Sequence, residues 1–164
     1  MIPELHRPIP VERVGPGGLD VVIEASAAEC TALAHRLKLP SVLSLICTFR
    51  LKREGAGVLL ADGNLSARVV QTCVVSLEEF PALVEERFFV RCVPEGEETD
   101  DADPESPDEI TYSGGALDLG EAAAEQLALA LDPYPHAPGA VLPEIPDEPV
   151  AGPFDSLASM RRRH

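Results

Sequence analysis

The chain has 164 residues, of which 45% are hydrophobic, so it is long and apolar enough to bury a core. Only 4% are aromatic and Trp is absent, which predicts a core of Leu, Val, Ile and Ala. The net charge of −15 repels phosphate backbones and attracts basic proteins, although solubility alone is another explanation of such a charge.

The first part of the chain predicts an extended lead-in, a strand and a helix. Within residues 1–25, Gly15–Gly18 predicts a turn and the β-branched run Leu19–Ile23 predicts a strand. Ser26 and Glu29 fit a capping box, in which each side chain satisfies a backbone amide at the start of a helix. Apolar residues at helical spacing follow, and we expect a helix over residues 26–37.

The next segment, residues 41–93, predicts an antiparallel sheet. A tight hairpin is expected at Asp62-Gly63-Asn64, because Gly and Asn tolerate positive φ. Consecutive hairpins favour a meander over a parallel sheet. The expected strands are Val42–Leu51, Val58–Ala61, Leu65–Val75 and Glu85–Val93.

An acidic insert follows at residues 94–109, interrupted by three prolines. It can bury almost nothing, so it predicts a flexible loop. Its carboxylates lack the ordered spacing of a calcium loop, and no metal is expected there.

The clearest helix is predicted over residues 118–131, where Asp118 and Glu121 fit a capping pair. Its spacing leaves Glu121 and Glu125 facing solvent. The buried stripe is expected to contain Leu119, Ala123, Leu127, Ala130 and Leu131.

Together these elements predict one α+β domain over residues 1–135, an antiparallel sheet packed by two helices. A Pro-rich tail over residues 136–164 follows. Near its end, a short amphipathic piece precedes the basic residues Arg161–Arg163, with apolar side chains at i, i+3 and i+6: Phe154, Leu157 and Met160.

Features that would indicate localisation or catalysis are absent from the sequence. The start, Met1–Glu4, lacks the charged-then-apolar pattern of a signal peptide, and no apolar run is long enough to cross a membrane. We therefore expect a cytoplasmic protein without membrane contact. Histidines are scattered, and neither a nucleophile elbow nor a phosphate-binding glycine loop is present, so no catalytic site and no cofactor are expected. An undetected hydrolase stays open as a further class.

The cysteines form no Cys-x-x-Cys pair and are expected to be reduced thiols. Cys47, Cys73 and Cys92 fall on three predicted strands and could converge on zinc with one His. Buried thiols that act as small core residues are the interpretation we favour, because structural zinc sites usually take closely spaced ligand pairs.

Three stretches in a fixed order resemble the YceD family of bacterial and plastid proteins: Val70–Glu78, Leu117–Glu121 with its continuation to Pro133, and Pro153–Ala158. The resemblance implies a role in accumulation of large-subunit ribosomal RNA and no catalytic activity. Many members carry Cys-x-x-Cys where this chain has Val70 and Cys73, so this chain keeps only the second cysteine of the motif on which a metal or redox role would depend.

We therefore expect a non-enzymatic ribosome biogenesis factor that binds a basic ribosomal or assembly protein, or an assembly intermediate. Direct binding to naked RNA is not expected, because the chain is acidic. A small cysteine-based metal-binding or regulatory module is the alternative. The expected partner-binding residues are Asp118, Leu119, Gly120, Glu121, Glu125, Phe154 and Leu157.

Overall fold

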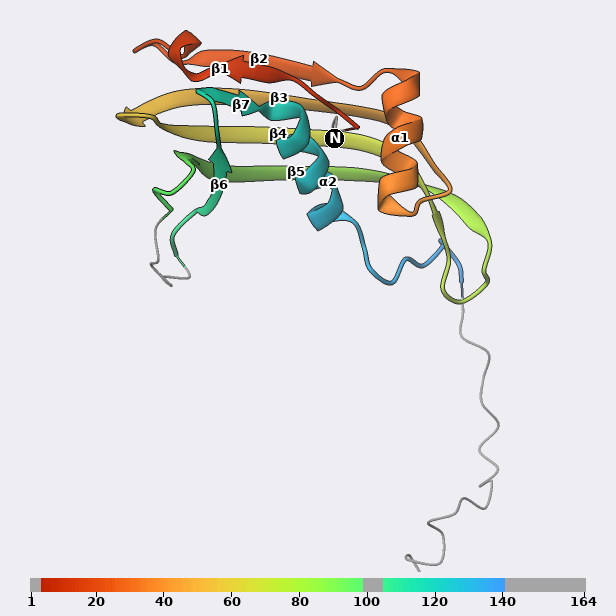
Figure 1. Ribbon diagram of the computed structural model, residues 1–164. Helices are drawn as coiled ribbons and strands as arrows, with labels where there is room; N and C mark the ends of the chain where they lie inside the picture. Colours follow the sequence, from red (N-terminus) through yellow and green to blue (C-terminus); the bar gives the residue numbers. More distant parts are fainter. Residues whose placement is uncertain (1–3, 99–104, 141–164) are drawn as a thin grey trace, which may run out of the picture.

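The computed structural model describes residues 4–98 and 105–140 and shows an α+β fold, as the sequence predicts (Figure 1). Two helices accompany a mostly antiparallel sheet. In chain order the elements are β1 (Pro8–Pro10), a 3-10 helix (Val11–Arg13), β2 (Leu19–Glu24), α1 (Ala27–Leu37), β3 (Ser41–Gly55), β4 (Val58–Thr72), β5 (Glu79–Pro94), β6 (Asp108–Tyr112), β7 (Ala116–Asp118) and α2 (Leu119–Ala130).

The main sheet has five strands in the order β2-β3-β4-β5-β6, and β1 pairs with β7 in a separate two-stranded sheet. The predicted antiparallel meander is confirmed for β2 to β5. β6 lies beyond the segment predicted as a sheet and runs parallel to β5, with Val90 opposite Asp108 and Pro94 opposite Tyr112. In the described part of the predicted lead-in, Pro8–Pro10 is extended and pairs with β7, whereas Val11–Arg13 forms a 3-10 helix.

One face of the main sheet carries the hydrophobic core. Along β4, buried residues alternate with more exposed ones, because successive side chains of a strand point to opposite faces. In Figure 1, α1 and α2 lie over the sheet, where α1 contacts β3 and α2 contacts β4 and β5. The core is mainly aliphatic as predicted; its aromatic members are Tyr112 and an edge-to-face pair of Phe49 and Phe88 with ring centroids 5.6 Å apart.

The hairpin predicted at Asp62-Gly63-Asn64 is wrong, because β4 passes through these residues without a break. Asp62 pairs with Arg50 and Asn64 pairs with Thr48 on β3. Gly63 is needed for a different reason: a Cβ at this position would lie 2.1 Å from Cζ of Phe88 on β5. The turn between β3 and β4 lies at residues 55–57 instead, where Gly57 has a φ of +75°.

Other strand boundaries also differ from those predicted. The strand expected at Leu65–Val75 ends at Thr72, and the strand expected at Glu85–Val93 begins at Glu79, opposite Thr72. A turn over residues 73–78 joins them, and β4 and β5 therefore form one long hairpin.

The prediction of a loop over residues 94–109 is wrong at its end, since β6 begins at Asp108. The carboxylate of Glu109 forms an ion pair with Arg91 of β5, and the buried Tyr112 covers Gly57. These contacts depend on residues about twenty to fifty positions apart, so local composition could not reveal them. Residues 99–104 of the insert lie outside the described residues.

Both predicted helices are confirmed. In α1, Ser26 and Glu29 form the expected capping box, and Cys30, Leu33 and Ala34 are buried. The α2 helix begins at Leu119, one residue after its cap Asp118, and ends at Ala130.

Candidate functional site

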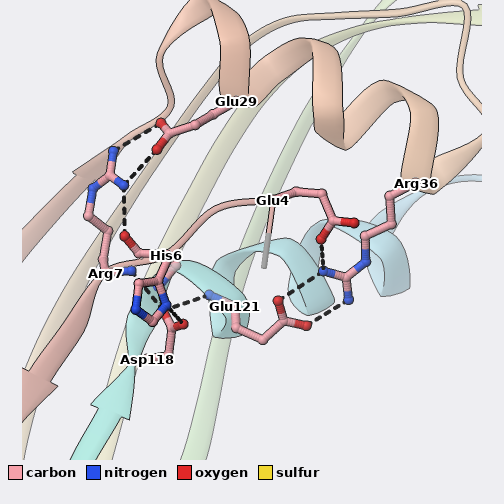
Figure 2. A network of polar contacts seen from close by, with 8 residues as sticks. Glu4, His6, Arg7, Glu29, Arg36, Asp118 and Glu121 are labelled. Carbon is pink, nitrogen blue, oxygen red and sulfur yellow. Dashed lines mark hydrogen bonds and ion pairs between the residues drawn. The ribbon is translucent and has the colours of Figure 1, made fainter. Parts of the chain in front are cut away.

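The start of α2 is a junction where the N-terminal segment crosses the helix (Figure 2). Asp118 Oδ1 accepts hydrogen bonds from the backbone N–H groups of Arg7 at 2.8 Å, Gly120 at 3.0 Å and Glu121 at 3.2 Å. Its Oδ2 atom lies 2.5 Å from Nδ1 of His6. Burial alone would raise the pKa of Asp118, but these hydrogen bonds outweigh it and hold the pKa below its usual value.

Gly120 permits the close approach of the two segments. A Cβ at this position would lie 2.6 Å from the carbonyl oxygen of Leu5, a backbone atom that cannot move without the whole segment. The backbone N–H of Leu119 donates to the carbonyl of Arg7 at 3.0 Å, and the side chains of Leu5 and Leu119 are fully buried. Glycine is therefore needed here for packing.

Two bidentate ion pairs complete the junction, as Figure 2 shows. Arg36 of α1 contacts Glu121 of α2 through Nη1–Oε2 at 2.9 Å and Nη2–Oε1 at 2.7 Å, and Glu4 lies 3.2 Å from Nη1. Arg7 contacts Glu29 at 2.7 and 2.9 Å. The hydrogen bonds from Arg7 and then from Ser26 lower the pKa of Glu29 to about 2.

The expected partner-binding residues therefore divide into two groups. Asp118, Leu119, Gly120 and Glu121 all contact other parts of the same chain, and the expectation that Glu121 faces solvent is wrong because it pairs with Arg36. Glu125, one turn further along α2, is exposed as predicted. Phe154 and Leu157 lie outside the described residues.

A pocket of about 440 Å³ opens beside this junction, between β6, β7 and the exposed side of α2. Four of its lining residues are acidic, and among the described residues no Lys, Arg or His lines it. Burial, followed by repulsion from Glu121, raises the pKa of Glu125. The acidic lining residues are Glu109, Asp118, Glu121 and Glu125.

A second pocket of about 390 Å³ continues the first along α2. The residues that line the two pockets are neighbours in the sequence, Asp108 and Glu109 on β6 and Glu125 and Gln126 on α2. Leu129, which is 74% exposed, lines this second part together with the acidic residues Glu86 and Asp108, and the lining is mainly polar. We name the combined feature the α2 groove; its second half is lined by Glu86, Phe88, Phe89, Val90, Asp108, Gln126, Leu129 and Ala130.

The cysteines do not converge on one site. Cys47 pairs with Leu65 of β4, whereas Cys92 pairs with Leu59 of the same strand. Leu59 and Leu65 are six residues apart, so the two cysteines lie about 20 Å apart along the strand direction, at about 3.3 Å per residue. Cys73 follows the far end of β4. Within the described part of the chain no group of metal ligands gathers, and burial raises the pKa values of the Cys47 and Cys92 thiols to about 12. These two cysteines are core residues, as predicted.

Cys73 has a different environment from the other cysteines. It lies in the turn after β4 rather than on the predicted strand, buried but outside the hydrophobic core cluster. The backbone N–H of Ser76 donates to its Sγ at 3.4 Å, and Val74 N–H donates to the carbonyl of Pro135 at 3.0 Å. Backbone hydrogen bonding from Ala137, then from Ser76, lowers the pKa of Cys73 to about 6.

Sequence reasoning missed several residues that shape this region. Arg7 and Arg36 are separated from Asp118 and Glu121 by more than eighty positions, and no local pattern links them. Leu129 carried a detectable signal, because it is a large apolar residue on the polar side of the predicted helix.

Comparison with known protein families gives a match over more than half of the chain. Residues 61–156 match the family model described as "Large ribosomal RNA subunit accumulation protein YceD". No curated protein and no solved structure matches the chain. Among the described residues, no helix is both long and apolar enough to span a membrane.

Proposed function

This chain belongs to the YceD family, and we propose that it is a non-enzymatic cytoplasmic factor that supports accumulation of large-subunit ribosomal RNA by binding a basic ribosomal or assembly protein. The family match over residues 61–156 carries the link to ribosomal RNA. The class of partner rests on the structure and charge of this chain.

The α2 groove supports a basic partner. Its six acidic residues are not balanced by any cationic side chain among the described lining residues. Three of them, Glu109, Asp118 and Glu121, already have partners within the chain. The carboxylates of the other three form no hydrogen bond or ion pair with the described residues: Glu86, Asp108 and Glu125. Opposite charge across an interface speeds encounter and fixes orientation.

Naked RNA is a poorer ligand for this surface. Phosphate contacts require clustered Lys and Arg, and the net charge of −15 opposes them. Arg87 and Arg91 of β5 form ion pairs with Asp62 and with Glu54 and Glu109, which reduces the attraction of the sheet for phosphate. A partner protein that itself contacts RNA accounts better for an effect on ribosomal RNA.

The test is co-sedimentation of the protein with large-subunit precursors in lysate. We expect Glu125→Lys to reduce the sedimenting fraction severalfold, because it reverses the charge of an exposed groove residue that forms no hydrogen bond or ion pair with the described residues. Glu79→Lys is the matched control, since Glu79 is also exposed but lies at the distant start of β5. Both variants should melt like the wild type, since surface substitutions usually change stability by no more than about 0.5 kcal/mol.

Wild-type sedimentation of Glu125→Lys would show that the α2 groove is not the binding site. Nuclease treatment of the lysate separates the two partner classes: association that survives it supports a protein partner. Submicromolar binding of the purified protein to naked large-subunit RNA at physiological salt would contradict the proposal.

A further inference from the structure

The strand β6 forms one edge of the main sheet. The strands run in the order β2-β3-β4-β5-β6, and across the described ranges 4–98 and 105–140 no other strand pairs with the outer side of β6. Such an edge presents backbone N–H and C=O groups that a further strand can use. The outer edge of β6 is therefore a template for strand addition.

One hydrogen bond fixes which residues of β6 face this outer edge. The carbonyl of Tyr112 accepts from the backbone N–H of Glu95, which follows Pro94, the residue opposite Tyr112. Alternate residues of a strand direct their backbone groups to the same neighbour. Ile110 and Tyr112 therefore bond to β5, and Thr111 between them directs its N–H and C=O outwards. Thr111 is also exposed to solvent.

The first pocket of the α2 groove runs along this edge. All residues of the range 109–113 line its volume of about 440 Å³, so the backbone of β6 forms one wall. The other wall is one face of α2 and its cap, because the lining residues are spaced by three and four positions: Asp118, Glu121, Ala122 and Glu125. A strand added to β6 would lie between a strand edge and an acidic helix face.

The position of α2 determines the side chains that such a strand should carry. Successive side chains of a strand point to opposite faces of the sheet. On the face that carries the core, Tyr112 is buried and α2 lies over the sheet (Figure 1). Every second side chain of the added strand therefore points to the side of α2, where Glu121 and Glu125 line the pocket. Because no Lys, Arg or His lines this pocket among the described residues, a cationic side chain meets only opposite charge there.

A second copy of this chain is a poor occupant of the same edge. β6 contains Asp108 and Glu109 and no cationic residue. Like charges on neighbouring strands destabilise their pairing, so two β6 strands repel each other. The net charge of −15 adds to this repulsion between copies. A segment that carries Lys or Arg is attracted instead.

We propose that the basic partner donates an extended segment that adds to β6 as a further strand of the main sheet, with Lys or Arg at every second position directed towards the α2 wall. Backbone hydrogen bonds to β6 supply affinity in this mode of recognition, and the alternate side chains supply specificity. That the segment belongs to a ribosomal or assembly protein rests on the proposed function, whereas the pairing with β6 does not.

The test uses the full ¹⁵N-labelled chain and a hexapeptide in which Lys and Val alternate. At saturating peptide, hydrogen exchange of the Thr111 amide should slow by about tenfold or more, because a bonded amide exchanges only when the structure opens locally. Val22 of β2, at the opposite edge of the sheet, should keep its exchange rate. Unchanged exchange at Thr111, or protection at Val22 instead, would overturn the proposal.

Two N-methylated hexapeptides separate backbone pairing from the attraction of charges. In an added strand only one alternate set of peptide N–H groups faces β6, either that of the Lys residues or that of the Val residues. Methylation of that set should weaken binding by about tenfold or more, and methylation of the other set should leave it nearly unchanged. Both peptides keep the full charge, so equal affinities would show that charge alone holds the peptide and would sink the strand.

A protein variant tests the same hydrogen bond from the other side. Thr111→Pro removes the outward N–H and no bond to β5, and proline is tolerated on this side of an edge strand. It should weaken the unmethylated hexapeptide roughly fivefold to tenfold. Val22→Pro is the matched control on the edge of β2 and should bind the peptide like the wild type. If Thr111→Pro does not melt like the wild type, the N-methylated pair decides, because it leaves the protein unaltered.

Two further outcomes separate this proposal from its alternatives. Protection of Thr111 that grows with protein concentration in the absence of peptide would make a second copy the occupant and would overturn the proposal. Sedimentation that Glu125→Lys reduces and Thr111→Pro leaves at the wild-type level removes the added strand and keeps the partner site. Protection of Thr111 by the hexapeptide, with sedimentation insensitive to both variants, supports the strand pairing and removes the proposed function.

Discussion

Arg36 of α1 and Glu121 of α2 form a bidentate ion pair that joins the two helices, with N–O distances of 2.9 and 2.7 Å. The side chains are 29% and 30% exposed, so water screens the pair only in part. This pair links two helices that are 85 residues apart in the sequence. It shows that the acidic motif at the start of α2 contributes to the fold.

A double-mutant cycle with Arg36→Met and Glu121→Gln, measured by urea unfolding, should therefore give a coupling energy of about 1 kcal/mol. This value is the upper end of the range typical of exposed ion pairs. The bidentate geometry fixes both side chains and favours that upper value. The pair Arg50 and Asp20, with an N–O distance of 3.7 Å and both side chains more than half exposed, is the control and should show almost no coupling. Equal coupling in both cycles would contradict this account.

Gly120→Ala should destabilise the protein although alanine favours helices. The new Cβ would lie 2.6 Å from the carbonyl oxygen of Leu5, and displacing that backbone costs about 1–3 kcal/mol, as in overpacked cores. The gain in helix propensity of about 1 kcal/mol offsets only part of this cost. Gly15→Ala, where nothing lies within 4 Å of the new Cβ, should leave the free energy of unfolding nearly unchanged.

Stability at acid pH should depend on Glu29. The pKa of this carboxyl falls from an ordinary value of 4.5 to about 2 in the folded protein, because Arg7 and Ser26 bond to the charged form. Its contribution is therefore complete above about pH 4.5 and is lost as the pH falls towards 2. Urea unfolding at a series of pH values should show a smaller loss in this window for Glu29→Gln than for the wild type.

One thiol should titrate near pH 6, and it should be that of Cys73. Because its pKa is lowered from 9.0, the stabilisation by its thiolate is present above pH 9 and is lost as the pH falls through about 6. Ultraviolet absorbance of the thiolate should follow this step in the wild type and lose it in Cys73→Ser. Cys30→Ser should retain the absorbance step. If the step disappeared in Cys30→Ser instead, Cys73 would not be the thiol that titrates near pH 6.

Local patterns in the sequence determined those elements whose stabilising contacts are close in the chain. The capping box of Ser26 and Glu29, the cap Asp118, the apolar stripes and the aliphatic core all follow from spacing and composition, because a helix joins residues three and four positions apart. The resemblance carried by residues 70–78 and 117–133 likewise agrees with the match over residues 61–156.

Only the tertiary structure decided the role of residues whose partners are distant. The sequence Asp62-Gly63-Asn64 is typical of a turn, yet it lies within β4, where the ring of Phe88 covers Gly63. Glu121 has the spacing of a solvent-facing residue, yet it pairs with Arg36. Gly120 is needed because the backbone of Leu5 passes too close to it for a side chain. A local pattern reports the face on which a side chain lies, whereas the neighbour on that face is set by the packing of distant segments.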